Sequence, residues 1–409
     1  MTEQTSASVG CHGLRIVFAS HTFIGGPFVV GSHHLAREMA RLGHAVIHLS
    51  TPVTPVHLLA KEKLDATKQR LGIWRRNGHV CDGMFLQYVP LGLLPWALAG
   101  PAFRYTGVNL TTITLPPLSV YLRRQGFSDI DLLFIDQPAF IGIERTLKPG
   151  ASIVRATDLS AAQGSPARRS AEIALANAAD GLVGTSQLVL DSLTGVAPTK
   201  PSALIENGVE LERFLASQPQ PPELRPLARP ILIYAGAMDE RFDHEAIIAL
   251  ARTCPDFNIV LIGPKPSQIA STHPKNIHLL GVRPYEQLAG YLQHADLGLL
   301  PLNDHPSNSG RSPMKLYEYA AAGLPVVARR MPEIARRDEP FVYCYERNSA
   351  LAETCRAALA QAGDKDAIRA RAIGQSWKSK AGQLLSFATG LLGHRRSSSM
   401  CGHSPLCGD

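Results

Sequence analysis

The chain has 409 residues, more than one hydrophobic core usually supports, so two domains of about 200 residues each are expected. Its 45% hydrophobic and 18% charged residues are typical of a globular protein and exclude a disordered chain or a coiled coil. The formal net charge is +7, and residues 1–205 hold 18 Lys and Arg against 13 Asp and Glu. This excess favours an anionic partner, such as a phosphate-bearing substrate or a membrane surface, although ordinary surface charge explains it equally well.

The seven cysteines form no CxxC pair and no cluster at metal-binding spacing, which indicates reduced thiols and a cytoplasmic protein. Residues 1–13 lack the basic-then-apolar order of a signal peptide. No segment reaches the roughly 18 apolar residues that a transmembrane helix needs. A basic stripe with interleaved aromatic residues is also missing, so nucleic acid is not an expected partner.

The first half is expected to begin with a βαβ unit. A strand over residues 14–20 precedes a loop containing Gly25 and Gly26, and a helix starting near Ser32 ends at Gly43 before a strand over residues 45–49. Further strands are expected over residues 131–135, 152–154 and 181–183, with a helix over residues 170–180. Alternating strands and helices predict a parallel sheet with helices on its faces.

Prolines concentrate between Pro198 and Pro230 and predict an interdomain linker over residues 201–229. The pattern then predicts strands over residues 231–235, 258–262, 277–280, 297–301 and 324–328, alternating with helices over residues 243–253, 285–294 and 313–322. We therefore expect two doubly wound domains, residues 1–200 and 230–375, with a site in the cleft between them. A helix over residues 376–393 is expected to cross back to the first domain, and residues 394–409 are expected to be disordered.

Lys315 and Glu318 lie three residues apart on one face of an expected helix, near its amino end. The free N–H groups of a helix amino end attract anions, and a lysine beside them suits a diphosphate. A carboxylate such as Glu318 can accept hydrogen bonds from a ribose diol. The spacing alone fits an ordinary surface Lys–Glu pair equally well.

The run Lys315-Leu-Tyr-Glu-Tyr-Ala-Ala-Ala-Gly-Leu-Pro-Val-Val327 resembles the donor-binding helix of GT-B glycosyltransferases, which carries the pattern E-A-x-A-x-G-x-P-V. The resemblance implies an α/β protein of two facing doubly wound domains that transfers a sugar from a nucleotide diphosphate sugar. Many retaining members of this group carry a second glutamate eight residues earlier. That position is Gly310 here, which counts against the usual retaining subgroup.

A closer resemblance is to the bacterial glucuronosyltransferase of xanthan synthesis and its relatives, which are inverting GT-B enzymes that use a UDP-sugar and a lipid-linked saccharide. Four segments carry it: Ser20-His-Thr-Phe23, Val154-Arg-Ala-Thr-Asp158, Ala235-Gly-Ala-Met238 and Pro313-Met-Lys-Leu-Tyr-Glu318. The resemblance implies that Asp158 is catalytic and that the nucleotide-sugar contacts include Met238, Met314, Lys315 and Glu318. Val282 stands where a glutamate that contacts the nucleotide base is expected. The resemblance therefore does not identify the donor sugar, which is glucuronic acid in that family.

Asp158 has a chemical role in this reading, because an inverting transferase needs one carboxylate to take the proton from the acceptor hydroxyl. The same residue could instead cap a helix or an Asx turn. His21, Gly25 and Gly26 could form a loop for the acceptor or a phosphate, although the glycines also fit a tight turn. Arg311 and Arg155 are candidate phosphate contacts.

We expect no metal and no cofactor besides the donor, because Lys315 and the helix dipole can stabilise the leaving diphosphate. The sequence Asp129-Ile-Asp131 matches the D-x-D pattern of metal-dependent transferases, but it precedes a strand and is interpreted as surface charge.

Residues 91–105 form an apolar, proline-broken stretch with Trp96, Phe103 and Tyr105, and Arg75 and Arg76 lie near it in sequence. This composition suits either docking on an anionic membrane or a buried helix pair. We therefore expect a protein peripheral to the inner face of the bacterial plasma membrane, with a lipid-linked saccharide as acceptor. A retaining transferase, a UDP-sugar epimerase and a non-catalytic nucleotide-sugar-binding protein are the alternatives.

Overall fold

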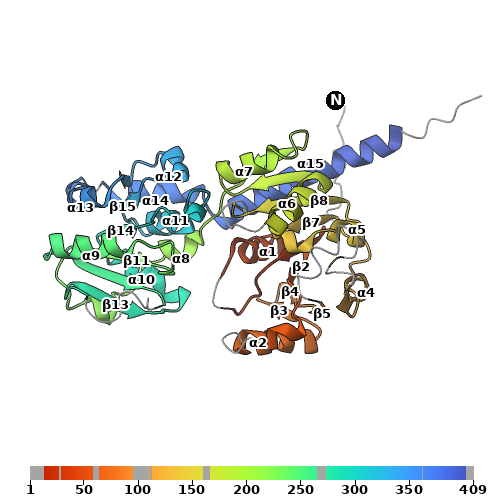
Figure 1. The fold of residues 1–409 in the computed structure, drawn as a ribbon, viewed down its shortest axis with the longest axis horizontal. Coiled ribbons are helices and arrows are strands. Elements are labelled where there is room, and N and C mark those ends of the chain that lie inside the picture. Colours follow the sequence, from red (N-terminus) through yellow and green to blue (C-terminus); the bar gives the residue numbers. More distant parts are fainter. Residues whose placement is uncertain are drawn as a thin grey trace, which may run out of the picture.

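The computed structural model describes residues 13–26, 29–58, 64–94, 109, 113–159, 166–264, 273–361 and 363–401, with side chains up to Gly393. These residues form two α/β domains, each built on one central, mainly parallel sheet (Figure 1). The predicted architecture of two doubly wound domains is confirmed.

The first domain is built on an eight-stranded sheet in the order β10-β9-β8-β7-β1-β2-β4-β3. All neighbouring strands pair in parallel except β3 and β4. The strands are β1 (Arg15–Ser20), β2 (Ala45–Ser50), β3 (His79–Cys81), β4 (Phe85–Tyr88), β7 (Leu132–Ile135), β8 (Ala151–Ala156), β9 (Gly181–Gly184) and β10 (Ser202–Leu204). A small hairpin, β5 (Leu91–Gly92) with β6 (Thr114–Leu115), lies outside this sheet.

The two faces of the first sheet are covered by different helices, because its central strands are apolar on both sides. One buried cluster packs the sheet against α4 (Leu118–Arg124), α5 (Ile143–Leu147), α6 (Pro166–Ala178) and α7 (Gln187–Thr194). The opposite cluster packs it against α1 (Gly31–Arg41) and α15 (Trp377–Cys401). Helix α2 (Leu64–Arg75) packs in a satellite cluster with Val53 and Val89.

The second domain has a six-stranded, fully parallel sheet in the order β13-β12-β11-β14-β15-β16. This is the dinucleotide-fold order, in which the connections reverse direction between β11 and β14. The strands are β11 (Ile231–Ala235), β12 (Asn258–Ile262), β13 (Ile277–Gly281), β14 (Leu297–Leu300), β15 (Val326–Arg329) and β16 (Val342–Tyr345).

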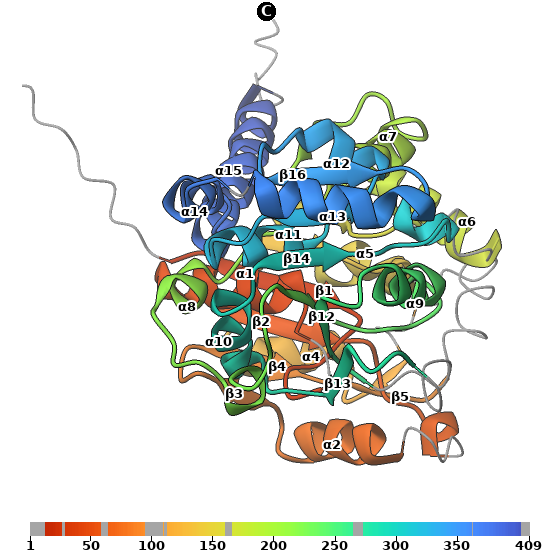
Figure 2. The ribbon, with the colours of Figure 1, turned by 90° about the vertical axis from the view of Figure 1, so that its left-hand side faces the viewer.

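Helices also cover both faces of the second sheet. One buried cluster includes residues of α8 (Leu211–Leu215), α10 (Leu288–Gln293), α11 (Met314–Ala321), α12 (Pro332–Arg337) and α14 (Lys365–Ile373). The other includes residues of α9 (His244–Thr253) and α13 (Leu351–Ala360), which lie on the side away from the first domain (Figures 1 and 2).

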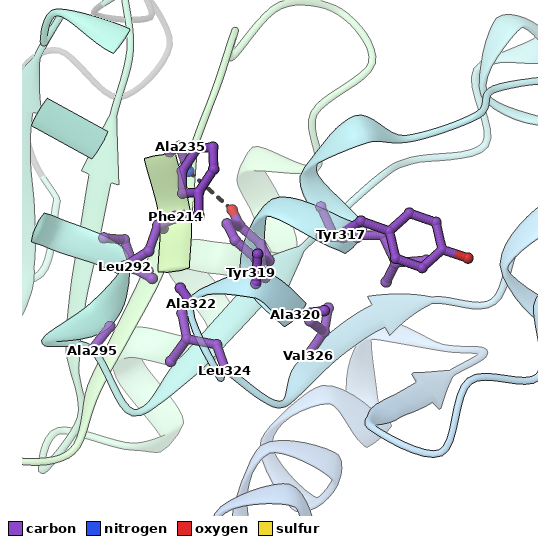
Figure 3. Close-up of a cluster of buried hydrophobic side chains, with 14 of the residues drawn as sticks. Phe214, Ala235, Leu292, Ala295, Tyr317, Tyr319, Ala320, Ala322, Leu324 and Val326 are labelled. Carbon is purple, nitrogen blue, oxygen red and sulfur yellow. Dashed lines mark hydrogen bonds between the residues drawn. The ribbon is translucent and has the colours of Figure 1, made fainter. Parts of the chain in front are cut away.

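Helix α11 is fixed to its sheet by Tyr319. The Ala235 N–H donates to the Tyr319 hydroxyl at 3.1 Å, and the ring lies against Gly298, where a Cβ would approach it to 2.5 Å (Figure 3). Tyr319 therefore holds α11 against the carboxyl end of β11 and the middle of β14.

The expected linker over residues 201–229 is not one free segment. Its start forms β10 and extends the first sheet, whereas Phe214 and Leu224 are buried in the second domain's core. Prolines are compatible with both, since they can flank an edge strand or begin a short helical turn.

Helix α15 leaves the second domain and lies along the first (Figure 1). Its buried residues, Trp377, Ala381, Leu384, Ala388 and Leu391, follow helical spacing and complete one face of the first sheet. The expectation of disorder from residue 394 is wrong as far as Cys401, because the helix continues to that residue. His394, Arg395 and Arg396 do not interrupt a helix, and the first strong breakers in the sequence are Gly402 and Pro405.

Candidate functional site

Each sheet has a switch point where its strand connections reverse direction, and in such folds the site lies at the carboxyl ends of the strands there. In the first domain this point lies between β1 and β7, which are followed by His21 and by Asp136 and Gln137. In the second domain it lies between β11 and β14, and Gly236 follows β11. The candidate residues of both domains cluster at these two edges.

Three cations of the second domain gather near the start of α11. Burial lowers the pKa of Lys315, and the positive charges of Arg311 and Arg241 lower it further. Among the described residues, neither Lys315 nor Arg311 has a side-chain hydrogen bond or ion pair. Arg241 is paired with Asp239, to which its Nε donates at 3.0 Å. Unpaired cations beside a helix amino end make an anion-binding site.

Two glycines let the Lys315 chain lie close to the backbone of the second domain. The Lys315 Nζ is 5.9 Å from the centre of the Tyr234 ring, and a Cβ on Gly236 would lie 2.2 Å from its Cε. Gly263 has a φ of +152° and a Cβ there would lie 2.0 Å from the Gly236 oxygen. A side chain at Gly236 would displace Lys315, and one at Gly263 would displace the Gly236 backbone beside which Lys315 lies.

Glu318 is buried one helical turn beyond Lys315. Its carboxylate accepts a hydrogen bond from the Tyr285 hydroxyl at 3.0 Å. Burial raises the pKa of Glu318, while Lys315 and the Tyr285 hydrogen bond oppose that rise. The carboxylate is thus oriented by a neighbour, as a ligand-binding group would need to be.

Asp158 lies just beyond β8 in the first domain and is close to the cations of the second. The Thr157 hydroxyl donates to its Oδ2 at 3.2 Å. Burial lowers the pKa of Arg311, and the nearby carboxylates of Asp158 and Asp239 oppose this effect. The hydrogen bond that Arg241 donates to Asp239 raises the pKa of Arg241, and the charge of Asp158 contributes in the same direction. Asp158 thus lies near Arg311 and Arg241 at the boundary between the domains, where the neighbouring residues Leu159 and Gly310 are in contact.

A cavity beside Asp158 is lined by polar side chains of the first domain, including Asp136, Gln137, Thr157 and Arg168. The Gln137 side-chain amide is 3.2 Å from the His21 Nδ1 and its oxygen accepts from Arg168 at 3.0 Å. His21 thus belongs to the same polar group as Asp158.

Position 310, where a second glutamate would stand in retaining enzymes, is a contact between the domains. A Cβ on Gly310 would approach the Leu159 Cγ to 2.6 Å, and the Gly310 oxygen accepts from the Ser186 hydroxyl at 2.8 Å. Next to it, the Glu333 carboxylate accepts the Gln187 N–H at 2.7 Å. Gly310 therefore has a structural role in the contact between the domains, besides marking the position where the second glutamate is absent.

The other candidates include two methionines that pack in hydrophobic clusters and two glycines in a loop. Met238 is buried in a core cluster of the second domain, and Met314 packs against the first domain's cluster containing Trp377. Gly25 has a φ of +95° in an exposed loop, with open space where a Cβ would lie. Gly26 packs on Phe23, so the structure shows both glycines in turn geometry.

Two further candidates have structural partners. Arg155 is buried and donates to Asp136 at 3.3 Å. Asp131 of the D-x-D sequence accepts the Arg15 N–H at 2.8 Å and thereby joins the amino ends of β7 and β1.

Sequence reasoning missed Arg241, Asp239, Gln137 and Arg168. Arg241 could have been found, because it lies in the loop after β11 that the Ala235–Met238 resemblance already marks. Gln137 and Arg168 are far apart in sequence, and only the packing of α6 against the sheet brings them together.

The aromatic residues expected at a membrane surface, Trp96, Phe103 and Tyr105, lie outside the described residues. Within the part of the chain that the structure describes, no helix is both long and apolar enough to cross a bilayer.

Two parallel-sheet α/β domains joined in this way are characteristic of the GT-B fold. Solved structures of that fold match nearly the whole chain: sucrose-phosphate synthase from Thermosynechococcus elongatus (TM-score 0.60, 17% identity, 95% of this chain and 100% of that one) and Anabaena HepE in complex with UDP and glucose (TM-score 0.64, 15% identity, 92% and 100%).

Residues 229–361 match the family model described as glycosyl transferases group 1. A curated relative, the putative teichuronic acid biosynthesis glycosyltransferase TuaH of Bacillus subtilis, is 28% identical over 203 residues. That match covers 46% of this chain and 51% of TuaH, so the chain matches about half the length of this relative. The second domain thus has the fold and sequence pattern of group 1 glycosyl transferases.

Proposed function

We propose that this protein transfers a sugar from a nucleotide diphosphate sugar, UDP-linked, to a lipid-linked glycan in bacterial polysaccharide synthesis, with inversion at the sugar carbon. The observation that carries the proposal is the pairing of opposite charges at the boundary between the domains. Lys315, Arg311 and Arg241 surround an anion site in the second domain, and the Asp158 carboxylate faces them from the first. A transferase of this kind needs both a held diphosphate and an opposing base.

The donor's diphosphate is assigned to the amino end of α11. Its first N–H groups lack acceptors within the helix, and Lys315 and Arg311 supply positive charge that no described carboxylate neutralises by an ion pair. The same groups stabilise the diphosphate as it leaves, so the proposal needs no metal ion. Glu318, held by Tyr285, is assigned to the ribose hydroxyls.

Inversion follows from one displacement. The acceptor hydroxyl oxygen attacks the sugar carbon, Asp158 takes the hydroxyl proton, and the carbon–oxygen bond to the diphosphate breaks. Gly310 supports this route over a retaining one, because its contact with Leu159 leaves no room for the second glutamate of the retaining pattern. His21, bonded to Gln137 near Asp158, is proposed to help orient the acceptor.

The polysaccharide context rests on TuaH, whose name assigns it to teichuronic acid biosynthesis, and the choice of UDP is supported by HepE, solved with UDP. A cytoplasmic location at the inner membrane face is proposed for the lipid-linked acceptor. Leu93 and Leu94, within the expected docking segment, are exposed, and Arg75 and Arg76 are exposed at the end of α2. Binding to phosphatidylglycerol vesicles in a flotation assay tests this, and failure to float would contradict it.

A thermal-shift screen against UDP-, GDP- and dTDP-sugars tests the donor assignment. Ligand at 100 times its Kd should add about 2.7 kcal/mol of stability. We expect UDP-sugars to raise the Tm and Lys315→Ala to abolish the rise. NMR of the product then gives the anomeric configuration. Retained configuration would indicate a retaining transferase, and conversion of the UDP-sugar without acceptor would indicate an epimerase. Binding without turnover would indicate a non-catalytic nucleotide-sugar-binding protein.

A further inference from the structure

The chain crosses between the domains twice, and the two crossings lie side by side. The Val209 N–H donates to the Gln375 oxygen at 2.9 Å, and the Trp377 N–H donates to the Val209 oxygen at 3.1 Å. Gly208 is packed against this pair, because a Cβ there would lie 3.0 Å from Trp377 and from the Gln375 oxygen. This pairing places Asn207, the residue before Gly208, between the two domains.

Asn207 is hydrogen-bonded to both halves of the proposed site. Its side-chain oxygen accepts from Arg155 of β8 at 3.0 Å. Its side-chain NH₂ donates to the Ser312 oxygen at 3.1 Å, and its backbone N–H donates to the Ser312 hydroxyl at 3.2 Å. Ser312 lies two residues before α11, and Arg155 lies three residues before Asp158. One amide thus joins the strand of the candidate base to the helix of the candidate donor site.

Both ends of this connection are themselves fixed. Arg155 is 1% exposed and donates to the buried Asp136, whose position follows the neighbouring strand β7. Ser312 receives a second hydrogen bond from Arg337 at 2.7 Å, at the end of α12. Because Arg155 and Ser312 are both held in place, a displacement of α11 relative to β8 would break the hydrogen bonds of Asn207.

We propose that Asn207 is a positioning residue that fixes the amino end of the donor helix α11 relative to Asp158, and so sets the distance between the donor's sugar carbon and the base. The inference rests on the proposed sugar transfer for its catalytic consequence, but the link itself is a property of the unliganded protein. In such a reaction, misplacement by about 1 Å can lower the rate by about 100-fold.

Charged residues near Asn207 also form contacts at the boundary between the domains, but their contacts do not connect Arg155 with Ser312. Glu206 faces Arg337 at 3.6 Å and Lys380 at 3.9 Å. Glu210 contacts the His34 Nδ1 at 3.0 Å in α1. These pairs tie the crossing to α12, α15 and α1, whereas Asn207, alone among the described residues, bonds to both Arg155 and Ser312.

Two substitutions at Asn207 separate its two bonds. Asn207→Ala removes both side-chain bonds, whereas Asn207→Asp keeps an acceptor for Arg155 and loses the donor to Ser312. The matched control is Asn276→Ala. Asn276 is also partly buried, and its side-chain NH₂ donates to the oxygens of Ala251, Cys254 and Phe257, all within the second domain.

The test combines steady-state kinetics with hydrogen exchange. Both Asn207 variants are expected to lower kcat between 10- and 100-fold with donor KM within threefold, while Asn276→Ala lowers the Tm and leaves kcat unchanged. In the unliganded protein, exchange at residues 312–316 and 155–159 should accelerate together in Asn207→Ala and not in the control. Unchanged kcat and unchanged exchange in Asn207→Ala would overturn the inference. If exchange accelerates in Asn207→Ala but the wild-type protein turns over no nucleotide sugar, the link through Asn207 is supported and the proposed function is contradicted.

Discussion

A carboxylate at the edge of a cationic cluster can either neutralise the cations or act on a substrate between them. Asp158 has no ion pair with Arg241 or Arg311 within 4.0 Å, although its charge affects the pKa of both. Asp239 provides the paired carboxylate instead, from the second domain. The separation leaves Asp158 available to an acceptor, which is the role proposed for it.

Asp158→Asn preserves the shape of this residue and removes its basicity. We expect the rate of transfer to fall by about 10²–10⁴-fold, the usual contribution of a general base. The affinity for UDP, measured by calorimetry, should change by less than threefold because the proposed diphosphate contacts lie in the second domain. Asp191→Asn, on the exposed face of α7, is the control for loss of one negative charge. Near-normal transfer by the Asp158 variant would remove this residue from the mechanism.

A second residue-scale property is the group of buried histidines beneath the first loop. Burial lowers the pKa of His48 to about 3 and that of His33 to about 2. His48 Nε2 is 3.1 Å from the Ser32 hydroxyl, and His33 Nε2 is 3.0 Å from the Thr22 hydroxyl. Both rings are therefore neutral in the folded protein at pH values where the unfolded chain is protonated.

The sign of the resulting pH dependence follows from proton binding. Below pH 6.5 the unfolded chain takes up protons that folded His48 does not, so stability falls as the pH decreases toward 3. At pH 5 the loss is about 2 kcal/mol for each such histidine. We expect His48→Asn to make the stability change between pH 7 and pH 5 smaller, as measured by urea denaturation. Substitution of the exposed His79 should leave that change as it is in the wild type, and an equal slope in all three proteins would contradict the prediction.

At the scale of elements, α11 and α15 show what sequence patterns can and cannot indicate. The strand–helix alternation and the breakers around Gly323 predicted α11 to within one residue at each end, because propensity and capping are local. The face that α15 covers could not be read from the pattern alone. Its apolar spacing indicates a buried stripe, but the first domain supplies the partner surface from residues far away in the sequence, such as Leu132 and Ile153.

The packing of α15 gives a direct stability prediction. Leu384 is fully buried against the first sheet, so Leu384→Ala should destabilise the first domain by about 2–4 kcal/mol. The measurement is the denaturant midpoint of the full-length protein. The neighbouring Gln383 is exposed, and Gln383→Ala should change stability by less than about 0.5 kcal/mol. Equal effects of the two substitutions would mean that α15 does not complete this core in solution.

At the scale of the whole molecule, the sequence predicted the two sheets and the cleft but not how the domains meet. Lys315 and Glu318 were visible because their helix and spacing are local features. Arg241 and Gln137 join the site only when the strand order is known, since parallel sheets bring loops from distant positions to one edge. Gly310 could be recognised as a missing glutamate, whereas its contact with Leu159 depends on the placement of both domains.

Gly310 therefore offers a test of the contact between the two domains. A glutamate there would meet Leu159 and Val189 of the first domain, and it would disturb the hydrogen bond from Ser186 to the Gly310 oxygen. We expect Gly310→Glu to hold the domains apart, which small-angle scattering would record as a larger radius of gyration. Transfer should fall at least tenfold while the second domain still binds UDP.

Ser309→Glu is the matched control, because it places the same charge one residue earlier, on a half-buried side chain that donates to the Pro306 oxygen at 2.8 Å. It should leave both the radius and the rate close to those of the wild type. If Gly310→Glu keeps the compact radius and instead gives a product of retained configuration, the glycine has been replacing a catalytic glutamate. In that case the inverting role of Asp158 is wrong.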